Sequence, residues 1–108
     1  MSYNIEISGR FEKEIRKLIR KSLSLKNEYA ALVASLKENP NQGTPIGHHC
    51  FKIRIAIESK GTGKSGGARI ITNVYVAGNV VYLLTIYDKS EQDNITDKDL
   101  LKLIKVIR

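Results

Sequence analysis

The spacing of apolar residues changes once along this chain, from a helical repeat to strand alternation. Phe11, Ile15, Leu18 and Ile19 recur at the spacing of one helix face. From Cys50 onward, apolar side chains alternate with charged or small ones, as a half-buried strand requires. Helices and strands are therefore segregated along the chain, which favours an α+β fold.

The first half of the sequence predicts a short strand followed by a helical hairpin. Residues 2–7 alternate weakly; residues 10–22 and 25–38 carry apolar stripes of helical period. Ser8 and Ser24 stand at the N-cap positions of the two helices. Asn39-Pro40 ends the second helix, and the composition of residues 39–49 predicts a loop.

The second half predicts three strands and a last helix. Residues 51–57 and 68–76 form strands around a loop, and Ala77-Gly78-Asn79 turns the chain into VVYLLTIY. The almost unbroken apolar character of VVYLLTIY predicts a central strand covered on both faces. Thr96 and Asp99 resemble a capping box that opens the final helix.

The order β-α-α-β-β-β-α predicts one α+β domain over residues 1–108. We expect the helical hairpin to pack on one face of a small antiparallel sheet. The other face is then expected to show Lys52, Arg54 and Arg69 to solvent, because alternate strand residues share a face.

The formal charge of +7 is concentrated in two blocks. Residues 10–26 carry seven Lys/Arg against two Glu, and residues 50–75 carry five against one. Such blocks favour an anionic partner, nucleic acid or acidic protein. No apolar run is long enough to cross a membrane, no secretory signal is visible, and the single cysteine, Cys50, predicts a cytoplasmic protein.

The segment Gly61-Thr62-Gly63-Lys64-Ser65-Gly66 matches a nucleotide-binding pattern only superficially. The dinucleotide motif needs a helix after its glycines, whereas a β-branched strand follows here. In a P-loop the first glycine would fall on Glu58. The segment is therefore a basic loop between strands, either a solvated hairpin loop or part of a phosphate site with its neighbouring cations.

Three further features each have a plain structural explanation beside a functional one. His48 and His49 are loop histidines or candidates for proton transfer, with no ligand set for a metal. Tyr87 is a strand-end aromatic, or it stacks on a base or moves a proton. The basic residues of the first helix form a solvated face or extend a nucleic-acid footprint; they are Lys13, Arg16, Lys17 and Arg20.

Two phrases, KIRIAIESKGTGKSGGARII and VYLLTIYDKSEQDNIT, together with the element order, resemble the RelE/ParE superfamily of bacterial toxins. The HigB-like branch, with its G-K-x-G-G-A-R-type loop and later I-Y-x-K-x-E stretch, is the most similar. The resemblance covers essentially the whole chain.

The resemblance implies a microbial-RNase-like fold and a ribosome-dependent endoribonuclease that cuts mRNA in the ribosomal A site without metal or cofactor. It implies a cognate antitoxin, encoded by a neighbouring gene, as a second partner. The catalytic residues implied by position are Lys52, Arg54, Lys64, Arg69 and Tyr87. We expect RNA contacts from Lys60 and Lys89 and from the helix residues Lys13, Arg16, Lys17 and Arg20. Thr62 stands where a further basic residue is common.

Two alternatives remain open at this stage. One is a ParE-like toxin that binds DNA gyrase and cuts nothing; the other is a degenerate member that only binds RNA. The retained Lys/Arg/Tyr set favours the nuclease, because a toxin without nuclease activity does not need phosphate ligands clustered on one face.

Overall fold

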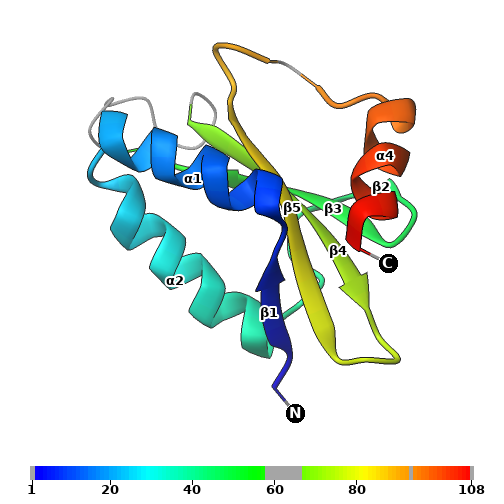
Figure 1. Cartoon of the computed structure of the whole chain (residues 1–108). Coiled ribbons are helices and arrows are strands. Elements are labelled where there is room, and N and C mark those ends of the chain that lie inside the picture. The colour runs from blue at the N-terminus through cyan, green and yellow to red at the C-terminus, as the bar shows by residue number, and fades with distance from the viewer. Residues whose placement is uncertain (1, 58–66, 93, 108) are drawn as a thin grey trace.

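A computed structural model describes residues 2–57, 67–92 and 94–107 (Figure 1). Its elements are β1 (Asn4–Ile7), α1 (Gly9–Lys21), α2 (Leu25–Glu38), β2 (Thr44–Gly47), β3 (Cys50–Ile55), β4 (Ala68–Tyr75), β5 (Val80–Asp88) and α4 (Asp97–Ile107). The predicted α+β class is confirmed. The helical hairpin, the β4–β5 hairpin and the last helix lie where the residue spacing places them.

The segment predicted as a loop contains an extra strand, β2, which pairs with the first half of β3. Pro45 and the flanking glycines are typical of a loop, and so the strand was not predicted. Proline is nevertheless tolerated here, because β2 is an edge strand of the sheet. Gly43 begins the approach to β3 with a φ of +98°, and a Cβ built on it lies 2.5 Å from the carbonyl oxygen of Lys52. Only glycine allows this approach.

The sheet is mixed rather than antiparallel. Its strand order is β1-β5-β4-β3-β2, and β1 runs parallel to β5 while the other pairs are antiparallel. The expectation of an all-antiparallel sheet was wrong for β1 because weak alternation in four residues carries no information about direction. As predicted, β5 is an inner strand with both faces covered.

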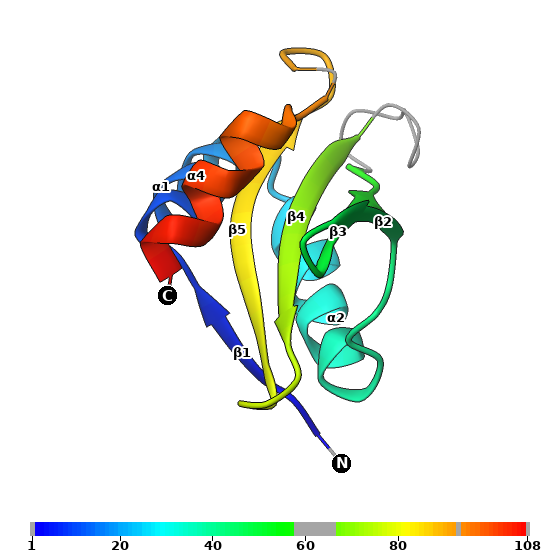
Figure 2. The ribbon, with the colours of Figure 1, turned by 90° about the vertical axis from the view of Figure 1, so that its right-hand side faces the viewer.

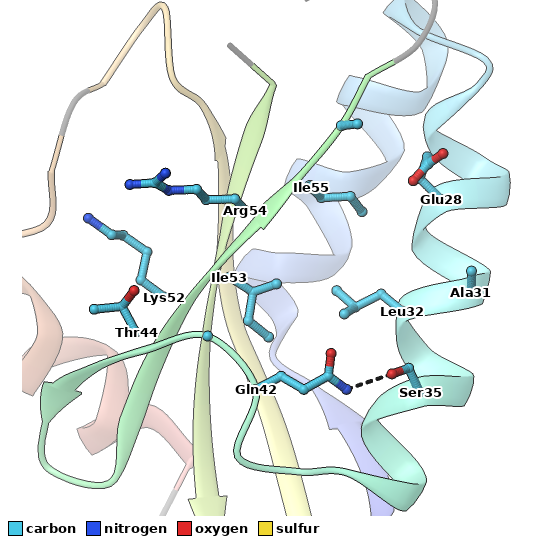
Figure 3. A pocket seen from close by; sticks show the side chains of 12 residues that line it. Glu28, Ala31, Leu32, Ser35, Gln42, Thr44, Lys52, Ile53, Arg54 and Ile55 are labelled. Carbon is cyan, nitrogen blue, oxygen red and sulfur yellow. Dashed lines mark hydrogen bonds between the residues drawn. The ribbon is translucent and has the colours of Figure 1, made fainter. Parts of the chain in front are cut away.

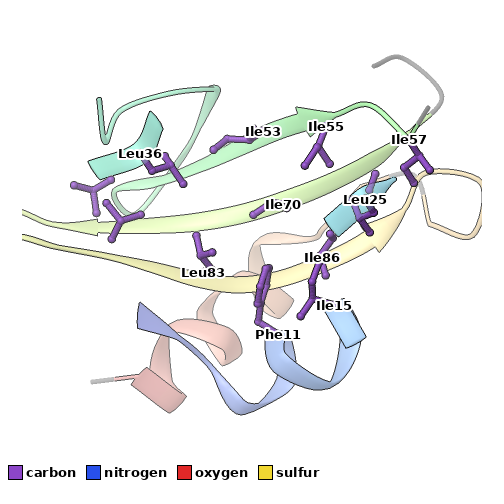
Figure 4. Close-up of a cluster of buried hydrophobic side chains, with 13 residues drawn as sticks. Phe11, Ile15, Leu25, Leu36, Ile53, Ile55, Ile57, Ile70, Leu83 and Ile86 are labelled. Carbon is purple, nitrogen blue, oxygen red and sulfur yellow. The ribbon is translucent and has the colours of Figure 1, made fainter. Parts of the chain in front are cut away.

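Helices cover both faces of the sheet, although all were expected on one. Phe11, Ile15, Leu25 and Leu36 of α1 and α2 pack with Ile53, Ile55, Ile70, Leu83 and Ile86 in the larger core (Figure 4). Helix α4 lies on the opposite face of the sheet (Figure 2). Its Leu100 and Leu103 pack there with Ile71, Leu84 and Tyr87. Because β5 carries apolar residues on both of its faces, the face opposite α1 and α2 also offers an apolar surface, and α4 packs on it.

Side-chain caps begin two of the three helices in the described part of the chain. Ser8 Oγ accepts a hydrogen bond from Phe11 N at 3.1 Å, and Thr96 Oγ1 accepts one from Asp99 N at 3.1 Å. These two predicted caps are confirmed. Ser24 makes no side-chain capping bond, because its own backbone is already helical. The short link between α1 and α2 leaves it inside the turn.

Helix α1 completes the outer edge of β5 where β1 ends. Glu14 Oε1 accepts hydrogen bonds from Thr85 Oγ1 at 2.7 Å and from the backbone nitrogen of Ile86 at 3.3 Å. The carboxylate therefore takes the place of a neighbouring strand for the backbone N–H of Ile86. It also ties α1 to the strand that carries Tyr87.

A β-bulge interrupts the β4–β5 ladder. Ile71 pairs with Thr85 and Thr72 pairs with Leu83, so that Leu84 is an extra residue in β5. Leu83 and Ile86, three residues apart, consequently face the same core. Because of the bulge, the core-facing residues before and after Leu84 lie on the same face of the sheet.

Candidate functional site

The strand register places Arg54, Arg69 and Tyr87 in one row across β3, β4 and β5. Arg54 pairs with Arg69, and Arg69 pairs with Tyr87. Lys52 lies two residues before Arg54, so its side chain emerges on the same face, away from α2 (Figure 3). Four of the five residues predicted as catalytic are therefore neighbours on one side of the sheet.

Arg69 is buried, with 3% of its surface exposed, whereas it was expected to face solvent. The reason is its strand: β4 lies inside the sheet, with Arg54 on one side and Tyr87 on the other. Its Nη1 donates a hydrogen bond to the carbonyl oxygen of Ala68 at 3.1 Å. Arg54, near the free edge of the sheet, is exposed as predicted.

Lys52 is half-buried, and its Nζ donates a hydrogen bond to Asn94 Oδ1 at 3.2 Å. Within the described residues neither Lys52 nor Arg54 forms an ion pair with a carboxylate. Their positive charge is thus available to an anionic ligand. Asn94 was not predicted as a site residue, since its partner lies 42 positions away and nothing local marks the contact.

Tyr87 is 7% exposed and belongs to the core beneath α4. Its ring packs among apolar side chains that include Ile71, Leu100 and Leu103. Tyr87 therefore lies next to Arg69 in the row but beneath the surface. Asp88, which follows it, is also buried and accepts hydrogen bonds from the backbone nitrogen and hydroxyl of Ser90.

The remaining predicted RNA contacts are not all gathered at this row. The basic residues of α1 are exposed, but α1 packs against the opposite face of the sheet; they are Lys13, Arg16, Lys17 and Arg20. Arg16 forms an ion pair with Glu12 at 2.7 Å. Lys89 is exposed just beyond β5. Lys60 and Lys64, like Thr62, lie outside the described residues.

The two histidines occupy the turn between β2 and β3. His48 and His49 have φ values of 56° and 60°, the left-handed pair typical of a type I′ hairpin turn. Asn73 Nδ2 donates to the His48 carbonyl oxygen at 3.0 Å, and the His48 ring contacts Asp97 at 3.1 Å. Nowhere in the described residues do three or more His, Cys, Asp or Glu side chains form a group that could hold a metal.

A groove of about 600 Å³ lies between α2 and β3, beside the row (Figure 3). Lys52 and Arg54 line one side of it, and Leu32, Ile53 and Ile55 line the other.

No helix in the described part of the chain is long and apolar enough to cross a membrane.

The architecture is that of the RelE-type toxins. The chain is similar to a double arginine-to-alanine mutant of E. coli RelE in the free state, with a TM-score of 0.68, 19% identity and 100% of both chains covered. The isolated E. coli RelE toxin gives a TM-score of 0.63 at 16% identity, covering 98% of this chain and 100% of that one. The RelBE2 toxin–antitoxin complex from Mycobacterium tuberculosis gives a TM-score of 0.57 at 16% identity, covering 82% of this chain and 92% of that one.

The sequence itself matches the model for the RelE toxin of the RelE/RelB toxin–antitoxin system over residues 10–107. The chain therefore belongs to the RelE toxin family, as its motifs indicated. The more specific HigB-like resemblance stays a prediction.

Proposed function

We propose that this chain is the toxin of a type II toxin–antitoxin module and cuts mRNA in the ribosomal A site. One observation carries the proposal: Arg54, Arg69 and Tyr87 form a continuous row across three strands, with Lys52 on the same face. Clustered guanidinium and ammonium groups suit a phosphodiester, whose charge they neutralise as it grows in the transition state.

The reaction is an internal transfer within the RNA. The 2′-hydroxyl oxygen bonds to the adjacent phosphorus, and the bond from phosphorus to the 5′-oxygen breaks. The 2′-hydroxyl proton passes to a base, and the leaving 5′-oxygen gains a proton from an acid. The products are a 2′,3′-cyclic phosphate and a 5′-hydroxyl, and the chemistry needs no cofactor.

The positions of the side chains suggest how they divide these tasks. Arg54, exposed and close to the sheet edge, binds the scissile phosphate directly. Arg69, buried beside it, adds positive charge from below and fixes the position of the row. Lys52 or Lys64 stabilises charge or moves a proton. The burial of Tyr87 favours proton handling over base stacking while α4 stays docked.

Induced expression in a bacterium, with transcriptome-wide mapping of mRNA 5′ ends, tests the proposal. We expect growth arrest with new 5′ ends inside translated messages, and none in messages whose translation is blocked. Arrest with intact messages and a loss of DNA supercoiling would instead support gyrase binding. RNA binding without new ends would support a degenerate member.

The same strain tests the partner. Co-expression of the protein encoded by the neighbouring gene is expected to relieve the arrest. That protein is expected to be acidic on its contacting surface, since charges complement each other across such interfaces.

A further inference from the structure

A small pocket lies at the end of β5, where the row of Arg54, Arg69 and Tyr87 ends. β1 stops at Ile7, which pairs with Leu83, so no strand of the described residues lies beside the last residues of β5. Helix α1 and the segment after β5 line a pocket of about 170 Å³ there. Pockets for drug-sized ligands measure about 300–1,000 Å³, so this smaller one suits a single ring system.

The pocket is within reach of an RNA chain held by the row. Tyr87 is the last residue of the row and also lines the pocket. The row crosses three neighbouring strands that lie about 4.8 Å apart, which places Tyr87 about 10 Å from Arg54. A phosphate bound at Arg54 therefore leaves a nearby nucleotide of the same RNA beside the pocket.

The lining of the pocket combines hydrogen-bond acceptors with donors. Among the described residues, three carboxylates and two ammonium groups line it; they belong to Glu14, Asp88, Glu91, Lys17 and Lys21. Lys21 Nζ already lies 3.9 Å from Glu91 Oε1. A phosphate would meet this excess of negative charge, whereas a neutral base has both donors and acceptors on its edges. The charges therefore favour a base over a phosphate.

Gln92 is the lining residue that is best placed to contact the edge of a base. It is half-buried, and its Nε2 donates a hydrogen bond to the Asn94 carbonyl oxygen at 3.2 Å. The backbone nitrogens of Glu91 and Gln92 donate to the Asp88 carbonyl oxygen at 3.0 and 3.2 Å. None of the described residues donates a hydrogen bond to Gln92 Oε1. The amide is thus held in place with an acceptor to offer.

The same hydrogen bonds connect the pocket with the phosphate site. Asn94 accepts from Gln92 through its carbonyl oxygen and from Lys52 Nζ through its Oδ1, the latter at 3.2 Å. A base held by Gln92 and a phosphate held near Lys52 therefore depend on one shared neighbour. Because exact placement of the reacting groups governs the rate, the base in the pocket should influence cleavage.

We propose that this pocket receives one base of the RNA near the scissile phosphate and favours a base with an exocyclic amino group. Gln92 Oε1 and the Glu91 carboxylate accept hydrogen bonds from the amino group of adenine, cytosine or guanine. Lys17 donates to a ring nitrogen or carbonyl oxygen of the same base. Uracil has no amino group and places a carbonyl oxygen against these acceptors. The inference rests on the proposed function for RNA as the ligand, and it assigns a base preference to it.

Cytosine and uracil are a matched pair of ligands, since they have the same size and differ in the group at C4. Cleavage is measured on programmed ribosomes with messages that carry one or the other base at each position around the cut. Wild-type toxin is expected to cut the message with uracil about fivefold more slowly at one fixed position, the discrimination that one good contact to a base edge gives.

The two glutamines of the chain provide matched variants. Gln92→Leu keeps the approximate size of the side chain and removes its hydrogen-bonding groups, so the difference between cytosine and uracil should disappear. Gln42→Leu makes the same change at another half-buried glutamine, whose amide also donates to its neighbours but which does not line this pocket. It should keep the difference. An unchanged base preference in folded Gln92→Leu, even with slower cleavage of every message, would overturn the proposal.

Binding of short 2′-O-methyl oligonucleotides to the wild-type protein needs neither a variant nor cleavage, because the methyl group blocks attack by the 2′-oxygen. Oligocytidylate is expected to bind about fivefold more tightly than oligouridylate. It should also shift the NMR signals of the Gln92 side-chain amide and of the backbone amides of residues 91 and 92. Equal binding of the two oligonucleotides, or unchanged signals at residues 91 and 92, would contradict the assignment of the pocket.

The failure of the proposed function is separable from the failure of this inference. If wild-type toxin cuts no mRNA but oligocytidylate still binds at Gln92 in preference to oligouridylate, the nuclease assignment fails and the base pocket stands. If the toxin cuts cytosine and uracil messages equally and residues 91 and 92 do not respond to oligonucleotides, the function stands and the pocket assignment fails.

Discussion

Arg54 and Arg69 face each other across the β3–β4 ladder, the first exposed and the second buried. Like charges directly opposite each other cost stability, and a bound anion offsets that cost. Arg54 can therefore contact a phosphate directly, while Arg69 supplies a fixed positive charge beneath it. The two arginines should respond differently to truncation.

Arg54→Ala is expected to lower mRNA cleavage by about 100-fold, the usual cost of removing one donor to a transition-state anion. Because Arg54 is exposed, the free energy of unfolding should change by less than about 0.5 kcal/mol. Single-turnover cleavage on programmed ribosomes measures the first effect and urea unfolding the second. Lys26→Ala, which removes an exposed cation from α2, serves as the control and should leave cleavage unchanged.

Arg69→Ala is expected to lower both cleavage and stability, since it removes the packing of a long buried side chain together with its charge. The loss of stability should be about 1–3 kcal/mol. Urea unfolding of the purified variant measures it, and cleavage is compared at a temperature where both proteins are folded. Full cleavage by folded Arg69→Ala would remove this residue from the site.

Asn94→Asp replaces the neutral partner of Lys52 with a carboxylate. The ion pair competes with substrate phosphate for the ammonium group, and an exposed pair of this kind is worth up to about 1 kcal/mol, or a roughly fivefold loss of cleavage. Raising the salt concentration should narrow the gap between variant and wild type, because salt screens exposed pairs. Asn27→Asp on α2 is the charge-matched control, and an equal loss there would contradict the role of Asn94.

Gly43→Ala should destabilise the protein by about 1–3 kcal/mol, because alanine is strained at this positive φ and its Cβ meets the Lys52 carbonyl. Gly9→Ala is a suitable comparison, since a Cβ there has nothing within 4 Å. Its effect should stay within about 0.5 kcal/mol. Urea unfolding of both variants measures the difference, and equal values would show that the chain relaxes around position 43.

Glu14→Ala should cost about 1–3 kcal/mol, because it leaves the Thr85 hydroxyl and the Ile86 amide without the carboxylate that they contact. Glu12→Ala, which removes only the exposed pair with Arg16, should cost about 0.5 kcal/mol or less. Thermal unfolding of the two variants at one pH compares them. A larger loss of stability for Glu12→Ala would show that the ion pair between Glu12 and Arg16 matters more than the contacts of Glu14 with β5.

Local sequence patterns were sufficient for much of this fold. The apolar stripes placed α1 and α2, and the turn residues placed the β4–β5 hairpin. Ser8 and Thr96 were found as caps because their partners lie three residues away. The common face of Lys52, Arg54 and Arg69 followed from alternation in two strands.

The features that escaped prediction depend on distant parts of the chain. The direction of β1 is set by its pairing with β5, in which Asn4 lies beside Val80, 76 positions away. The burial of Arg69 depends on where β4 lies in the sheet, and the contact between Lys52 and Asn94 depends on how the chain returns toward α4. None of these has a local signature.

The bulge at Leu84 also bears on how the length of this chain can vary among descendants. A regular strand that loses one residue exchanges its inner and outer faces on one side of the loss. At Leu84 the strand already carries one residue more than its partner, so a deletion there straightens β5 and leaves Tyr87 on the face of Arg69. Loss of a single codon here thus removes the Leu84 side chain from beneath α4 but leaves the remaining residues of β5 on their original faces.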